Sequence, residues 1–205
     1  EYHKYGSHIF HTSNENVWKY INKFTKFNNY RHQVLSVFKN KTYQMPFNLE
    51  TINSFYNKNF NPTEAEIFLR KVVSKDKFDN PKNLEEKAIS QIGKKLYEAF
   101  VKNYTTKQWG ISPKNLPNSI FNRLPIRFNY NEDYFNHCKY QGIPLHGYTS
   151  IFNNLLDNKK IKILENCDYF KVKNKINVKY LTIYTGPIDK YFNFKFGKLD
   201  WRSVK

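Results

Sequence analysis

The sequence predicts a mixed α/β fold, in which helices and short antiparallel strands are interleaved along the chain. Residues 33–46 alternate apolar and polar side chains on both sides of a Lys39-Asn40-Lys41 turn, which is typical of a β-hairpin. Residues 49–104 instead repeat apolar side chains at helical spacing. Because strands and helices follow one another several times, we expect modules that are threaded into one another rather than strung in series.

The first helix is predicted close to the N-terminus. Residues 1–12 have the pattern of a strand end and a loop, and Thr12 or Ser13 follows as a helix cap. Glu15 then lies in the first turn, where a carboxylate is stabilised by the helix dipole. Helical spacing gives this helix a buried face made of Val17, Ile21 and Phe24.

Local signals define the later elements. Asn61-Pro62 predicts a helix start, because proline suits the first helical position and acidic residues follow it. Gly93 is a candidate break within the apolar helical pattern of residues 84–104. The rest of the chain divides into a strand region with exposed aromatics at 126–141, a short helix at 147–157, and β-rich segments at 161–164 and 177–185.

Composition is that of an ordinary soluble globular protein. The chain has 205 residues, of which 40% are hydrophobic and 25% charged, enough for one large domain or two small ones. No apolar run approaches the length of a membrane span and no signal peptide is evident, so we expect a cytoplasmic protein with no membrane partner. The chain starts at Glu1 rather than Met and ends at Lys205, from which we expect a fragment or a processed piece.

Cysteine content and net charge bear on whether the protein is disulfide-bonded, binds zinc or binds nucleic acid. Cys138 and Cys167 are too few for a disulfide framework and fit no zinc spacing, which favours free thiols in a reducing compartment. The net charge of +17 is the best argument for a nucleic-acid partner. The lysines are scattered rather than gathered in one stripe, however, and the chain is rich in residues favoured by AT-rich coding. Nucleic-acid binding is therefore the second hypothesis rather than the first.

The most informative stretch runs from Phe100 to Phe135. Aromatic rings, arginines and amides alternate there at loop-like spacing around Pro113, Pro117 and Pro125. Such a mixture suits a ligand with a flat base, a sugar and a diphosphate, because rings stack on bases and guanidinium groups bind phosphate oxygens bidentately. No Ser/His/Asp triad, phosphate-binding glycine loop or metal motif accompanies it.

Nine segments, in this order, resemble the UDP-galactopyranose mutase family, and together they span essentially the whole chain. Each is weak alone, and their order makes them specific. They are Tyr5–Thr12, Pro46–Asn53, Ile92–Phe100, Tyr104–Gly110, Arg123–Tyr130, Tyr134–Asn136, Gln141–Pro144, Gly147–Thr149 and Tyr184–Asp189.

The resemblance implies a flavoenzyme that interconverts UDP-galactopyranose and UDP-galactofuranose for cell-surface glycan synthesis. In that family, reduced FAD attacks the anomeric carbon, UDP leaves, and the sugar–flavin adduct opens and recloses as the five-membered ring. The implied fold is a partial FAD-binding α/β domain with an inserted helical domain and an antiparallel sheet. The implied division is 1–30 and 147–190 in the FAD-binding domain, 31–48 and 126–146 in the sheet region, 49–125 in the helical substrate domain, and 191–205 at the start of a further sheet region.

The resemblance also assigns the substrate residues. Arg123 would clamp the diphosphate and stabilise charge on departing UDP, and its alternative role is an ordinary surface arginine. Phe100 and Tyr104 lie one helical turn apart and would form the uridine slot, whereas helical spacing alone favours core packing. Thr105 would meet the nucleotide, and Trp109 would line the sugar–diphosphate region or serve as a buried structural tryptophan.

Two further substrate contacts lie elsewhere in the chain. Tyr134 matches a tyrosine that reaches the diphosphate, although it could equally be a cross-strand aromatic. His32 stands where family members often carry an asparagine that touches substrate, and an imidazole can donate a hydrogen bond in its place.

On the cofactor side, the resemblance places His8 and Ile9 against the flavin by backbone contacts. His11 would lie near the isoalloxazine ring and tune its protonation, or be merely hydrogen-bonded. His8 and His11 show no third ligand near them in sequence, so no metal site is predicted. The remaining cofactor contacts would come from Asn166, Cys167, Gly186 and Pro187.

Two sequence features of this family are not found in these 205 residues. One is the glycine-rich dinucleotide fingerprint, and the other is a C-terminal part with a second phosphate-binding arginine. We therefore expect that this piece alone neither holds FAD tightly nor turns over. A homodimer is possible. The alternatives left open are a basic nucleic-acid-binding module and an inactive remnant that binds a sugar nucleotide.

Overall fold

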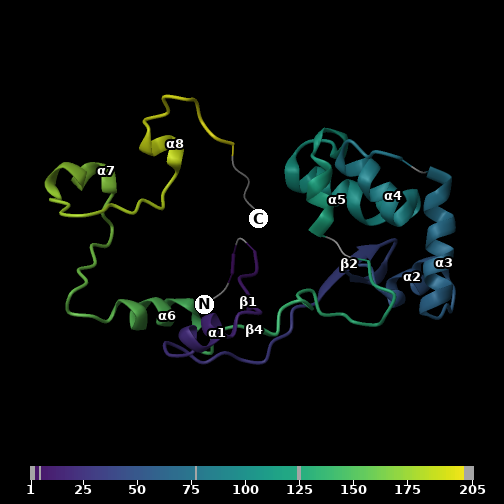
Figure 1. The fold of residues 1–205 in the computed structure, drawn as a ribbon, viewed down its shortest axis with the longest axis horizontal. Coiled ribbons are helices and arrows are strands. Elements are labelled where there is room, and N and C mark those ends of the chain that lie inside the picture. The colour runs from purple at the N-terminus through teal and green to yellow at the C-terminus, as the bar shows by residue number, and fades with distance from the viewer. Residues whose placement is uncertain (1–2, 5, 77, 124–125, 201–205) are drawn as a thin grey trace.

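The computed structural model describes residues 3–4, 6–76, 78–123 and 126–200, with the backbone alone of residues 122 and 123. Figure 1 shows three groups of elements. The described residues between 34 and 129 form a helical lobe, and residues 6–33 and 130–156 form a small sheet unit. Residues 157–200 form a C-terminal part that extends away from both. The fold is mixed, with small antiparallel sheets, as the sequence predicts.

The helical lobe begins with the predicted hairpin. Strand β2 (Val34–Phe38) pairs antiparallel with β3 (Lys41–Met45), and Val34 lies opposite Met45. Lys39 and Asn40 both have positive φ angles, of 50° and 59°. A two-residue turn with this geometry matches the right-handed twist of the flanking strands. The predicted hairpin is confirmed, except that Lys41 belongs to β3 and not to the turn.

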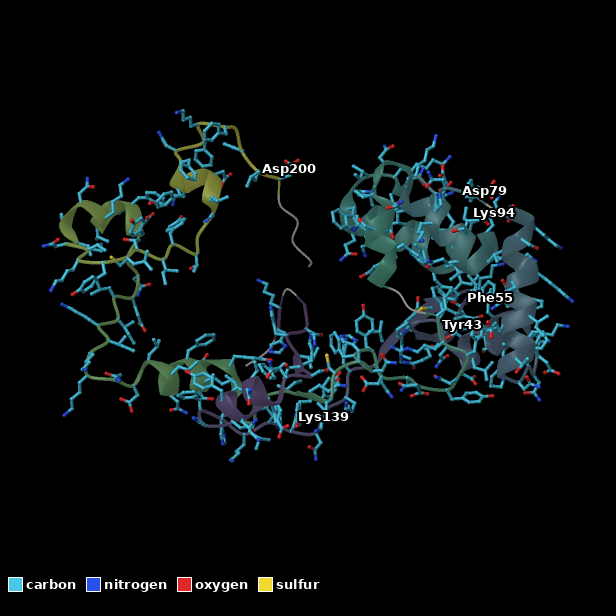
Figure 2. The ribbon with its side chains drawn as sticks, in the orientation of Figure 1. Tyr43, Phe55, Asp79, Lys94, Lys139 and Asp200 are labelled. Carbon is cyan, nitrogen blue, oxygen red and sulfur yellow. The ribbon has the colours of Figure 1, made fainter. Side chains whose placement is uncertain are left out.

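Four helices pack around this hairpin and build the core of the protein. They are α2 (Leu49–Tyr56), α3 (Pro62–Val73), α4 (Leu84–Leu96) and α5 (Lys102–Trp109), and a π-helical turn at Tyr97–Val101 joins the last two. Short 3₁₀ turns at Ser74–Asp76, Pro113–Asn115 and Asn118–Arg123 complete the lobe. Its core includes Phe47, Leu49, Ile52, Leu69, Leu84, Ile92, Leu96, Tyr97, Phe100 and Phe121. In Figure 2 the side chains crowd together here, around Tyr43 and Phe55.

The start of α3 follows the sequence signal closely. Asn61 Oδ1 accepts a hydrogen bond of 3.0 Å from the backbone N–H of Glu64, and Glu64 Oε2 accepts one of 2.9 Å from the backbone N–H of Asn61. This reciprocal capping box satisfies two backbone donors that have no partner inside the helix. Pro62 occupies the first helical position, as predicted.

Gly93 breaks α4, which the sequence also indicated. Its φ of 77° and ψ of 158° lie outside the helical region, in a conformation that L-residues with a side chain rarely adopt. A Cβ atom added to Gly93 would lie 2.5 Å from Cγ1 of Val72 on the neighbouring helix α3. The kink therefore needs glycine both for its backbone angles and for the close approach of α3.

Replacing Gly93 by alanine is expected to lower the free energy of unfolding by roughly 1–3 kcal/mol, because the new side chain is strained at this φ and collides with Val72. Urea unfolding measures the change. The double variant Gly93→Ala/Val72→Ala removes the collision but keeps the backbone strain. If Gly93→Ala is as stable as the parent, α4 does not adopt this kink in solution.

The sheet unit joins segments that are far apart in sequence. Strand β1 (Phe10–Thr12) pairs antiparallel with β4 (Tyr140–Gly142), and His11 lies opposite Gln141. Helices α1 (Glu15–Ile21) and α6 (Gly147–Leu156) flank this pair. The predicted helix at 147–157 is confirmed.

The predictions for α1 were partly wrong. Its N-cap is Asn14, whose side chain accepts hydrogen bonds from the backbone N–H groups of Asn16 and Val17. The hydroxyl of Thr12 instead accepts from the N–H of Asn14, and that of Ser13 donates to the carbonyl of His137. None of the residues of α1 is buried, and Val17 of the predicted buried face is 44% exposed. The helix packs through the ring of Trp18, whose centroid lies 5.0 Å from those of both Phe27 and Tyr140.

The C-terminal part holds two one-turn helices, α7 (Tyr169–Val172) and α8 (Ile188–Tyr191), and a 3₁₀ turn at Lys173–Lys175. Among the described residues no strand follows Gly142, so the strands predicted at 161–164 and 177–185 are wrong for this structure. The region 126–141 likewise contributes only the first residues of β4. A β-prone segment forms a strand only where another strand can pair with it. No helix among the described residues has the length and apolarity to cross a bilayer.

Candidate functional site

A pocket of about 750 Å³ opens beside β1 in the sheet unit. Three residues that the sequence assigns to the cofactor, His8, Ile9 and His11, all line it. Aromatic residues from the other side of the unit complete the wall, namely Phe135, Tyr148 and Phe152. The hydroxyl of Tyr148 donates a hydrogen bond of 2.8 Å to the carbonyl of His8. Apolar walls with a few polar groups are typical of sites that bind a flat ligand.

Rings continue from this pocket toward the predicted substrate residues. The imidazole of His11 stacks on Phe135 with centroids 3.8 Å apart and planes 12° apart. His32 stacks on the same Phe135 ring at 5.7 Å. Tyr134 meets His32 edge-on at 5.6 Å. The structure therefore brings three predicted site residues, His11, His32 and Tyr134, into one row of rings, which we call the ring row, with Phe135 at its centre.

The loop that presents Tyr134 is held by a buried arginine. Arg127 is 6% exposed, and its Nη1 donates to the backbone carbonyls of Asp133 at 2.7 Å and Asn131 at 3.2 Å. Nη2 of the same group reaches the carbonyl of Tyr134 at 3.5 Å. Because the guanidinium donates its hydrogen bonds to backbone oxygens, Arg127 has a structural role in this loop.

A second set of hydrogen bonds fixes His32 against the same loop. The N–H of Tyr134 donates to the carbonyl of His32 at 2.8 Å, and the N–H of His32 donates to Oε1 of Gln141 at 3.2 Å. Gln141 in turn donates through Nε2 to both carboxylate oxygens of Asp133, at 2.8 and 2.7 Å. Strand β4 thus positions two members of the ring row.

Partial desolvation lowers the pKa of both histidines in the ring row, although His11 stays largely exposed to solvent. Desolvation lowers the pKa of His11 below its usual value of 6.5, and the nearby His137 lowers it further. Desolvation also lowers the pKa of His32, partly offset by the carboxylate of Asp133. Both imidazoles are therefore neutral at neutral pH, when each ring can donate one hydrogen bond and accept another.

The side chains of Phe100 and Tyr104 lie in different environments within the helical lobe. Phe100 is 8% exposed and lies in the core, whereas Tyr104 is 65% exposed on the surface of α5. Helical spacing predicts that the two rings share one face, and they do not. The reason is the π-helical turn at Tyr97–Val101, which shifts the rotation per residue and turns the two side chains apart. Such turns occur frequently at functional sites.

The other predicted substrate residues of this lobe lie along α5 and after it. Thr105 is buried and Trp109 is half-buried, packed against the core on the same inner side of the helix. Arg123 ends a 3₁₀ turn, and its side chain lies outside the described residues. The pocket beside β1 takes none of its lining from α5. The substrate roles of Phe100, Tyr104, Thr105, Trp109 and Arg123 stay predictions.

Four of the predicted cofactor residues lie in the C-terminal part. Asn166 has a positive φ of 54°, Cys167 is exposed, and Gly186 precedes Pro187 at the start of α8. The ring of Tyr184 lies so close to Gly186 that any side chain there would collide with it. Figure 1 places α7 and α8 well away from β1, so the structure does not bring these four residues to the pocket.

Sequence reasoning missed a cluster next to His11. The structure brings His137 and Cys138 to this residue, and Nδ1 of His11 lies 3.2 Å from Sγ of Cys138. The structure therefore brings two potential metal ligands to His11 that are remote from it in sequence. No local signal could have revealed it, because 126 and 127 positions separate the partners along the chain.

The chain shares its sequence with proteins of one family. The sequence model of the UDP-galactopyranose mutase family matches residues 99–205, about half of the chain. The chain belongs to the UDP-galactopyranose mutase family. This family is the one that the ordered motifs resemble, so that identification is confirmed.

Curated relatives extend the likeness along the whole chain. A Klebsiella pneumoniae protein named as a probable UDP-galactopyranose mutase is 39% identical over 98% of this chain, and an Escherichia coli dTDP-fucopyranose mutase is 38% identical over 98%. UDP-galactopyranose mutase of Mycoplasma genitalium is 32% identical over 99%. The chain spans about half the length of these relatives, covering 52%, 54% and 53% of them.

Proposed function

We propose that the protein takes part in the isomerisation of UDP-galactopyranose to UDP-galactofuranose for cell-surface glycans. The observation that supports this most strongly is the 39% identity to a mutase relative over 98% of the chain. The predicted base-binding and diphosphate-binding residues fall within the stretch that the family model matches. In this proposal Tyr104 stacks on the uracil ring, while Arg123 and Tyr134 bind the diphosphate and stabilise the charge on departing UDP.

The pocket beside β1 fits the ring end of FAD. Its wall of Ile9, Phe10, Phe135 and Tyr148 is apolar and aromatic, which suits a flat isoalloxazine ring. When bound, reduced FAD supplies the nucleophile for the anomeric carbon of the sugar. The backbone of His8 and Ile9 would hold the ring edge, and the neutral imidazole of His11 would donate or accept one proton beside it.

The ring row supports one further step of this proposal. Because Phe135 contacts both His11 and His32, a ligand in the pocket and a ligand beside Tyr134 would share one wall. The neutral His32 ring could then donate to a substrate oxygen, as the asparagine of other family members would. The rings would also exclude water from the reacting carbon.

A second sugar nucleotide, dTDP-fucopyranose, is also a candidate substrate. The Escherichia coli relative is named for dTDP-fucopyranose and is 38% identical to this chain, so overall identity does not separate the two substrates. The two nucleotides differ in their base and in the 2′-hydroxyl. A binding comparison of UDP with dTDP therefore decides between them.

Replacing Tyr104 by alanine is expected to weaken UDP binding by on the order of tenfold, because base–aromatic stacking contributes about 1–3 kcal/mol. Isothermal titration of the protein with UDP and with dTDP measures the loss. Tyr104→Phe keeps the ring and should bind UDP as the parent does. Tyr20→Ala removes another exposed ring, from α1, and should also leave binding unchanged.

Two outcomes would count against this function. Equal UDP affinity in Tyr104→Ala and the parent would remove Tyr104 from the base site. Single-stranded DNA that binds more tightly than UDP, with a steep loss of affinity in salt, would favour the nucleic-acid hypothesis instead.

A further inference from the structure

The cluster beside the pocket contains three metal-ligating groups from two distant segments. His11 comes from β1, and His137 and Cys138 come from the loop before β4. One imidazole nitrogen of each histidine and the sulfur of Cys138 all lie within 4.8 Å of one another. The separation between His11 Nδ1 and Cys138 Sγ is 3.2 Å.

These separations are close to those of a bound metal ion. Zinc binds histidine nitrogen at about 2.0–2.1 Å and cysteine sulfur at about 2.3 Å in a tetrahedral arrangement, which places neighbouring ligand atoms roughly 3.3–3.6 Å apart. The separations in the structure, all within 4.8 Å, exceed this tetrahedral spacing by at most about 1.5 Å. Two imidazoles and one thiolate are also ligand types that zinc prefers over the oxygen ligands of magnesium or calcium.

The backbone around the cluster is already fixed. The pairing of β1 with β4 holds Thr12 opposite Tyr140, and Ser13 Oγ donates to the carbonyl of His137 at 2.5 Å. The N–H of Cys138 donates to the carbonyl of Phe135 at 2.7 Å. The ring of Phe135, stacked at 3.8 Å, sets the plane of the His11 imidazole. A ligand set that is oriented in advance loses little conformational freedom on binding.

Burial distinguishes Cys138 from an ordinary surface thiol. Cys138 is 6% exposed, whereas Cys167, the other cysteine, is exposed. His11 and His137 are both exposed, so a cation can reach the cluster from the solvent. The two histidines are therefore accessible to a cation from solvent, whereas the sulfur ligand is buried.

We propose that His11, His137 and Cys138 form a binding site for Zn²⁺ or a similar borderline divalent cation, with the fourth coordination position open. On binding, the S–H bond of Cys138 breaks, its proton passes to solvent, and the thiolate binds the metal together with one nitrogen of each neutral imidazole. His11 and Phe135 also line the pocket, so a bound cation changes the wall that the pocket presents. This site does not depend on the identity of the sugar nucleotide.

Titration of the protein with Co²⁺ tests the proposal. We expect one equivalent to bind, with a near-ultraviolet thiolate-to-cobalt charge-transfer band and the strong visible bands of tetrahedral cobalt. One equivalent of Zn²⁺ should remove these bands. X-ray absorption of the zinc-loaded protein should show one sulfur and two imidazole nitrogens, and this measurement needs no variant.

Variants identify the ligands. Cys138→Ser should abolish the charge-transfer band, and His137→Gln, at an exposed position, should weaken the affinity by on the order of tenfold or more. The matched controls Cys167→Ser and His146→Gln replace the other cysteine and a histidine outside the cluster, and should leave cobalt binding unchanged. The absence of a one-to-one complex, or a sulfur signal lost only in Cys167→Ser, would overturn the site.

Discussion

Replacing Phe100 by alanine is expected to lower the free energy of unfolding by about 3–5 kcal/mol, as for other buried Phe→Ala changes. Phe100 is 8% exposed, and its ring lies among four others. Its centroid is 5.0 Å from Tyr43, 5.5 Å from Phe55, 5.7 Å from Phe38 and 5.9 Å from Phe47. Deleting the ring removes these contacts and leaves a cavity between the hairpin, α2 and the π-helical turn. Urea unfolding followed by circular dichroism measures the change.

Tyr104→Ala is the matched control for Phe100→Ala. Its ring is 65% exposed, so truncation should change the free energy of unfolding by no more than about 0.5 kcal/mol. The pair separates the core role from the ligand role. If Phe100→Ala were as stable as the parent but bound UDP more weakly, the ring would serve the nucleotide and not the core.

Local signals predicted the helical lobe well. The turn after Phe38, the helix start at Asn61-Pro62 and the break at Gly93 each depend on the conformational preferences of a few neighbouring residues. Such preferences are present in the sequence itself, and nearby contacts do not override them. The same reasoning failed at Phe100 and Tyr104, because one π-helical turn changes which side chains share a face.

Long-range arrangement could not be predicted in the same way. The pairing of β1 with β4 joins His11 to Gln141, and neither three-residue strand has a distinctive pattern. That pairing also creates the cluster of His11 with Cys138, although cysteine and histidine counts predict no metal motif. The family resemblance assigns His8, Ile9 and His11 to the cofactor, and all three line the pocket beside β1, but their cofactor role stays a prediction.

The C-terminal part shows that β-strand propensity alone does not determine where a strand forms. Residues 177–185 are rich in β-forming side chains, and the structure gives them no strand partner. Their apolar side chains are left exposed, among them Tyr180, Leu181 and Ile183. A sheet depends on cross-strand contacts for its stability, so the same sequence is extended but unpaired where no neighbour is present.

Amide hydrogens of residues 158–199 are expected to exchange on the order of 10³-fold faster than those of α4, because the C-terminal part has little buried structure to open. Among the described residues, none after Ile151 is buried, whereas Ile92 and Leu96 in α4 are fully buried. The whole chain exposes 15670 Å², against about 10,000 Å² for a compact protein of 24.8 kDa. Hydrogen exchange followed by mass spectrometry of peptides from each region measures the contrast.

The outcome also tests what the exposed apolar side chains contact in solution. Slow exchange at residues 177–185 would contradict the expectation for a single copy of the chain, since the structure offers these amides no partner. Repeating the measurement after a hundredfold dilution separates two causes of such protection. Protection lost on dilution would mean that a second copy covers the surface, as the possible homodimer requires. Protection that persists would mean that residues 177–185 pair within one chain, and the unpaired arrangement of the C-terminal part would then be wrong.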